Sequence, residues 1–184
     1  MKTLLLFGIL LISGSIYAQG STTPRNDSLD KLPTYGIDLA SNNRNAHHSG
    51  LSLGLANAGT VRNGVCLGFG NGTDKVNGLD ISPLASVMDT LNGIAITGLW
   101  FGGAGSSCGP DQHLVNGIVI SGLIAATREC NGVIIAPFTG TRKTRGMQVG
   151  LFNGTQELHG IQIGLINYAE NGFLKWFPGF NIGI

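Results

Sequence analysis

A six-residue phrase that recurs at a nearly fixed interval is the feature that most limits what this chain can fold into. The chain reads GIQIGL from Gly160, and fourteen residues earlier it reads GMQVGL from Gly146. Glycine followed by apolar, variable, apolar and small residues can be aligned ten times, with units starting at Gly36, Gly50, Gly64, Gly78, Gly93, Gly117, Gly132, Gly146, Gly160 and Gly179. A short, regular period is typical of repeat architectures, so we expect a single β-repeat domain over residues 36–184.

Within each unit, apolar residues alternate with one variable residue. Alternation with a period of two predicts a β-strand with one buried face. Because apolar positions normally fill the interior, the variable residues between them are expected to be exposed. These residues form the variable column: Asp38, Ser52, Cys66, Asp80, Ala95, Val119, Ile134, Gln148, Gln162 and Asn181.

Asparagine marks two places in the unit. It stands directly before the unit glycine in five units and seven residues after it in four units, and the unit of Gly64 has both. Asn and Gly both tolerate positive φ, so both places predict sharp turns. The two sets are Asn63, Asn77, Asn92, Asn116 and Asn131, and Asn57, Asn71, Asn153 and Asn167.

Two all-β architectures fit units of 14–15 residues. In a β-solenoid, which we favour, each unit is one coil, and the asparagines form ladders along the corners. In the alternative, pairs such as Asn77-Gly78 make hairpin turns, and the chain is an antiparallel meander or a small β-barrel. The same phrase at the same phase in every unit favours parallel stacking, whereas short turns join antiparallel strands most simply.

The residues before the first unit predict export. Residues 1–18 have a lysine, an apolar run and a small residue at the end, which is the pattern of a signal peptide cleaved after Ala18. Residues 19–35 are polar and contain two prolines, so they are expected to form a flexible leader. The expected location is the periplasm, the outer membrane or the cell surface. The net charge of +1 gives no reason to expect a nucleic-acid partner.

The repeat breaks its period most strongly between Gly93 and Gly117, which are 24 residues apart. We interpret residues 100–113 as an inserted loop, because insertions in repeat proteins become loops on one face. Trp100, Phe101 and His113 are the candidate partner-binding residues of this loop. The alternative is that the two aromatic residues cap the core and the loop has no binding role.

The remaining motifs do not indicate catalysis. In an exported protein Cys108 and Cys130 are the candidate disulfide pair, and the absence of a disulfide fits the sequence equally well. The sequence contains no P-loop, HExxH or paired-cysteine motif. We therefore predict no enzymatic activity, no catalytic, cofactor-binding or metal-binding residue, and no cofactor.

Two phrases resemble a known group of proteins. GIQIGLIN at residues 160–167 and FPGFNIG at residues 177–183 are similar to the surface-repeat proteins of Gram-negative bacteria, which contain many G-h-Q-h-G-h-x-N units. The resemblance is specific over 146–184 and loose over 36–135, where other residues replace Gln. It implies an exported protein at or near the bacterial cell surface, and it brings no catalytic residues.

The function expected from the sequence is structural or partner-binding, with an unknown protein or polysaccharide partner at the cell surface. The alternative is an outer-membrane β-barrel that acts as a channel or an anchor. Membrane association is expected only in that form.

Overall fold

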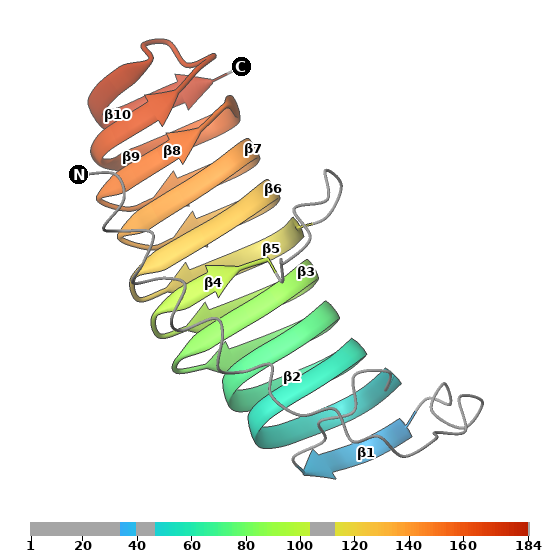
Figure 1. Cartoon of the computed structure of the whole chain (residues 1–184). Helices are drawn as coiled ribbons and strands as arrows, with labels where there is room; N and C mark the ends of the chain where they lie inside the picture. The colour runs from blue at the N-terminus through green and yellow to red at the C-terminus, as the bar shows by residue number, and fades with distance from the viewer. Residues whose placement is uncertain (1–33, 40–46, 104–112, 184) are drawn as a thin grey trace, which may run out of the picture.

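The structure is a computed structural model that describes residues 34–39, 47–103 and 113–183 of the chain. These residues form strands and turns, with no helix among them. Figure 1 shows that the coils stack along one axis, from β1 at one end to β9 and β10 at the other. The strands are β1 (Thr34–Leu39), β2 (His47–Ser82), β3 (Ala85–Thr97), β4 (Trp100–Gly102), β5 (Leu114–Ser121), β6 (Ile124–Ile135), β7 (Phe138–Val149), β8 (Phe152–Thr155), β9 (Glu157–Ala169) and β10 (Trp176–Gly183).

Successive coils pair in parallel and keep the repeat in register. Gly78 lies beside Gly93, Gly93 beside Gly117, and Gly117 beside Gly132. The last strand, β10, is the exception, because it folds back and pairs antiparallel with β9. The chain is therefore a β-solenoid, as favoured from the sequence, and not one of the antiparallel alternatives.

The corner at each unit glycine follows the sequence prediction, whereas the turn predicted at the second asparagine set is wrong, because residues such as Asn57 and Asn167 lie buried within strands and do not have positive φ. All ten unit glycines have positive φ, between 92° and 150°. The asparagines before them form a ladder, in which the side-chain amide of each donates to the amide oxygen of the asparagine one coil earlier. The four N···O distances lie between 2.6 and 2.9 Å, and the ladder runs from Asn63 through Asn77, Asn92 and Asn116 to Asn131.

The inserted segment begins later than predicted. Strand β4 pairs in parallel with β3 and β6, and Trp100 lies in register between Ala85 and Ile124. Residues 100–102 therefore complete a regular coil, so the predicted loop 100–113 starts too early. Residues 104–112 lie outside the described part of the chain.

The two faces of the strands are the reverse of the prediction. Ala95, Val119 and Gln162, all in the variable column, are 0% exposed. Their apolar neighbours in the sequence point outward, and Ile94 and Ile96 are 40% and 39% exposed. The prediction that the variable column is exposed is therefore wrong. The narrow interior accepts polar residues, because stacked coils place partners for them about 4.8 Å away.

The interior changes character along the solenoid axis. Its middle coils enclose a hydrophobic cluster made of Val76, Met88, Leu91, Ala95, Phe101, Val115, Val119, Ala125, Cys130, Ile134 and Ala136. Toward the C-terminus the buried column becomes polar, and Gln162 Nε2 donates to Gln148 Oε1 over 2.7 Å. Toward the N-terminus the buried residues include Arg62 and Asp80.

Candidate functional site

The most distinctive surface of the solenoid consists of three stacked columns of outward apolar side chains. Two columns lie on the strand after each unit glycine, on either side of the variable column, and the third lies at the following corner. The strand pairs keep equivalent residues in register from coil to coil. At the corner, backbone hydrogen bonds between neighbouring coils keep equivalent residues in register, for example the bond from Leu99 N to Leu84 O over 3.0 Å.

We call these three columns the apolar face. The first column contains Ile37, Leu51, Val65, Leu79, Ile94, Ile118, Val133, Met147 and Ile161; the second contains Leu39, Leu53, Leu67, Ile81, Ile96, Ile120, Ile135, Val149 and Ile163; the third contains Leu55, Phe69, Leu84, Leu99, Leu123, Pro137, Leu151 and Leu165. No position of the apolar face carries a charged or polar side chain. Such a large, continuous apolar surface is unusual on a monomer and typically marks an interaction site.

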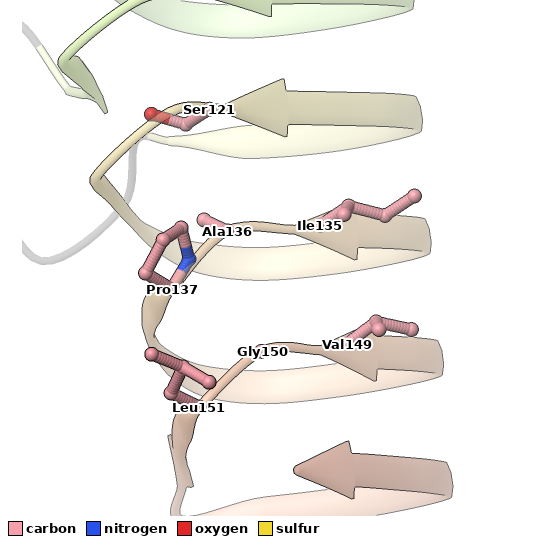
Figure 2. A pocket seen from close by; sticks show the side chains of 7 residues that line it. All are labelled: Ser121, Ile135, Ala136, Pro137, Val149, Gly150 and Leu151. Carbon is pink, nitrogen blue, oxygen red and sulfur yellow. The ribbon is translucent and has the colours of Figure 1, made fainter.

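A shallow hollow of about 340 Å³ lies between the second and third columns. Figure 2 shows Ile135 and Val149 on one side of it, and Pro137 and Leu151 on the other. Between them lie Ala136, whose side chain is buried in the hydrophobic cluster, and Gly150, so no side chain projects outward there and the surface is recessed. The hollow is thus a groove within the apolar face and can accept an apolar side chain of a partner.

The other side of each coil carries the charges and forms the polar face. Five basic and four acidic residues lie there: Lys75, Arg128, Arg142, Lys143, Arg145, Asp74, Asp89, Glu129 and Glu157. Lys143 Nζ lies 2.5 Å from Glu157 Oε2, and this contact lowers the pKa of the Glu157 carboxyl group. The five basic and four acidic groups nearly cancel, so the polar face has little net charge.

The structure does not bring the predicted binding residues together in one site. Phe101 is 2% exposed and belongs to the hydrophobic cluster, so its assignment to a binding loop is wrong. Trp100 is half-buried in β4. His113 is half-buried, and its Nδ1 lies 3.4 Å from Asp89 Oδ1.

The two described cysteines, Cys66 and Cys130, are buried inside the solenoid. Burial raises the pKa of the Cys66 thiol to about 11 and that of Cys130 to about 12. A cysteine thiol with so high a pKa stays protonated and unreactive near neutral pH. Cys108 lies outside the described residues, so its pairing with Cys130 stays a prediction.

The N-terminal coils enclose a cluster of buried polar groups. Arg62 Nη1 lies 3.3 Å from Asp38 Oδ2 and also contacts Ser52 Oγ. Asp80 accepts hydrogen bonds from Asn71, over 2.5 Å, and from Ser86. These groups satisfy one another away from solvent, so the cluster has a structural role.

Burial raises the pKa of the Asp80 carboxyl group above its ordinary value of 3.8, despite the Ser86, Asn71 and Arg62 groups that act in the opposite direction. A folded-state pKa above the unfolded one means that the folded state retains the proton. The stability from this group is complete below pH 3.8 and is lost as the pH rises through the raised pKa.

We therefore expect Asp80→Asn to remove part of the decline in unfolding free energy between pH 4 and pH 8. Urea unfolding of both proteins across this range measures the difference between them. Parallel pH profiles would show that Asp80 keeps its negative charge in the folded protein.

The described residues contain no group of three or more His, Cys, Asp or Glu side chains placed to hold a metal ion. In the same part of the chain there is no helix that could span a lipid bilayer. A scan against protein-family models gave no match, and searches of curated proteins and of solved structures gave none either.

The apolar face was missed at the sequence level because its residues were assigned to the interior. One signal in the sequence could have indicated it. Gln148 and Gln162 occupy equivalent positions one coil apart, and equivalent amides in neighbouring coils are suited to pair inside a solenoid. If that column is inward, alternation places the isoleucine columns outside.

Proposed function

We propose that this chain is an exported, non-catalytic repeat protein of the bacterial cell envelope that acts by binding a partner through its apolar face. The observation that carries the proposal is the continuous apolar face, which carries no charged side chain along nine coils. Burying so much aliphatic surface against a partner removes it from water, which is the dominant favourable contribution in most protein association.

A protein partner fits this surface better than a polysaccharide. Sugar hydroxyl groups need hydrogen-bonding partners when they lose water, and the side chains of the apolar face offer none. The partner is therefore expected to present an apolar surface of its own, and to be a protein.

The chemistry of the described side chains supports binding rather than catalysis. The hollow is lined by aliphatic groups and by one hydroxyl group, that of Ser121. The Ser121 Oγ donates a hydrogen bond to Ile124 O over 2.8 Å. The buried carboxyl group of Asp80 is enclosed by its hydrogen-bonding partners and has no exposed surface. Neither place combines a nucleophile with a base near an accessible surface, as a catalytic site requires.

Export is supported by the N-terminal sequence and by the resemblance to Gram-negative surface-repeat proteins. The test is expression of the full chain in a Gram-negative host, followed by fractionation and N-terminal sequencing. We expect a processed protein that starts at Gln19 and lies in the periplasm, the outer membrane or the medium. A matched chain without residues 2–18 should stay in the cytoplasm. A full-length cytoplasmic protein that still begins at Met1 would contradict the proposal.

A further inference from the structure

We infer that the partner of the apolar face is a second copy of this chain, and that two solenoids pack face to face about a two-fold axis. The inference rests on the proposed use of the apolar face for binding, and it names the occupant. Its support comes from the area of the face, its regular form and the distribution of charge around it.

The area is sufficient for a specific dimer. Nine coils about 4.8 Å apart, with three columns about 6.7 Å apart along the strand, give a face of roughly 40 by 15 Å. Two such faces bury about 1,200 Å² or more in total, because side-chain relief adds to the flat area. Stable protein–protein interfaces begin at about this size.

The form of the face is self-complementary. Parallel coils in register place its side chains in straight columns with one spacing, and a second copy has the same spacing. Flat sheets of this kind pack face to face about 10 Å apart, with their side chains interdigitating. The hollow between the second and third columns provides space for an apolar side chain of the partner copy. A dimer about a two-fold axis uses the same surface twice, as homodimers commonly do.

Charge distribution favours a second copy over a lipid surface. Elements that lie on membranes usually have an excess of Lys and Arg on their polar side. Here five basic residues are balanced by four acidic ones on the polar face. The apolar face itself has no charge to leave unpaired when two copies meet.

The chain's own leader is a poor candidate for the occupant. Residues 19–33 contain only two large apolar side chains, Leu29 and Leu32, together with charged and polar residues. Two leucines cannot cover three columns that run along nine coils. A second copy supplies an apolar surface of equal length.

The test compares two lysine substitutions on opposite sides of the solenoid in the purified processed protein. Ile96 lies in the second column near the middle of the apolar face, so a two-fold axis there places both copies of residue 96 close together. Gln156 is exposed on the other side of the coil. Light scattering and sedimentation over a range of concentrations give the mass and the dimer dissociation constant.

We expect the unsubstituted protein and Gln156→Lys to have twice the mass of one chain. Ile96→Lys should raise the dimer dissociation constant by about 100-fold or more, because it buries unpaired charges in the interface. Circular dichroism checks that each variant keeps its β-structure. If Ile96→Lys does not fold, Ile96→Thr keeps the β-branched shape, and it should weaken the dimer by a smaller factor.

Three outcomes would overturn the inference. The first is an unsubstituted protein that stays monomeric at every concentration. The second is a dimer that Ile96→Lys leaves unchanged. The third is a monomer that floats with vesicles of phosphatidylethanolamine and phosphatidylglycerol, which would identify a lipid surface as the occupant.

Failure of the dimer and failure of the proposed function can be distinguished. If the protein is monomeric but Ile96→Lys releases it from the envelope fraction, a different partner covers the apolar face, and only the dimer is excluded. If neither the mass nor the envelope location responds to Ile96→Lys, the apolar face is not a binding surface and both proposals fail.

Discussion

Replacing Gln148 and Gln162 together with lysine is expected to prevent folding. Both side chains are 0% exposed, and they lie side by side on neighbouring strands. Each buried ammonium group without a counter-ion costs several kcal/mol, and here two like charges would lie on adjacent coils. Because small domains are stable by only about 5–15 kcal/mol, the pair should abolish the cooperative unfolding transition.

The matched control moves both lysines by one position along the same strands. Met147 and Ile161 pair in the same register as the two glutamines but point outward. Met147→Lys with Ile161→Lys should fold, with a loss of about 1 kcal/mol from like charges on adjacent strands. Circular dichroism measures the β-structure of both double variants, and urea unfolding measures their unfolding free energies. If the glutamine pair tolerates lysine and the outward pair does not, the glutamine column points outward and the apolar columns point inward.

Much of the fold could be predicted because the same residue types recur at the same positions of every unit. A glycine at the same phase in every unit indicates a backbone position that other residues cannot occupy, and ten positive φ values confirm it. Asparagine before the glycine indicates a corner where stacked amides can pair, and the ladder from Asn63 to Asn131 does so. Both features depend on local geometry, which sequence patterns express well.

The inward and outward faces could not be predicted, because alternation shows that two faces differ but not which is buried. The usual assumption places the more apolar face inside. A solenoid interior is narrow, and it satisfies polar groups by stacking, as Asn153 and Asn167 do over 2.8 Å. In the middle coils the inward residues Val119 and Ile134 are apolar as well, so hydrophobicity does not separate the faces there.

The candidate binding surface was missed for a related reason. The sequence predicted a binding site at the break in the repeat, where Trp100 and Phe101 precede a glycine-rich stretch. Phe101 instead continues a buried position, between Ser86 in the previous coil and Ala125 in the next. The apolar face is built from the most regular part of the sequence, and one side chain in a single unit does not reveal it.

Gly117→Ala is the second substitution with a large expected effect. Gly117 has φ of 146° and lies in the middle of the stack, against the backbone of Gly93. A methyl group there would run into the Gly93 carbonyl group, and alanine also disfavours this φ. Backbone strain and displacement of the two coils should together reduce the unfolding free energy by about 4 kcal/mol.

Gly140→Ala is the control for glycine replacement in general. Gly140 does not have positive φ, a Cβ atom there would meet no atom within 4 Å, and the coil before it already carries Ala126 in register. This change should be neutral or stabilise the fold by up to about 1 kcal/mol, because alanine restricts the unfolded chain. Urea unfolding measures both variants.

The unfolding profile of Gly117→Ala should also change shape. Each coil of a solenoid contacts only its neighbours, so a defect in the middle weakens the coupling between the two halves. We expect a broader or two-step transition for Gly117→Ala and a single step for Gly140→Ala. Equal, single-step unfolding of the two variants would mean that the coil corners do not require glycine, and that stacking of the corners does not hold the solenoid together.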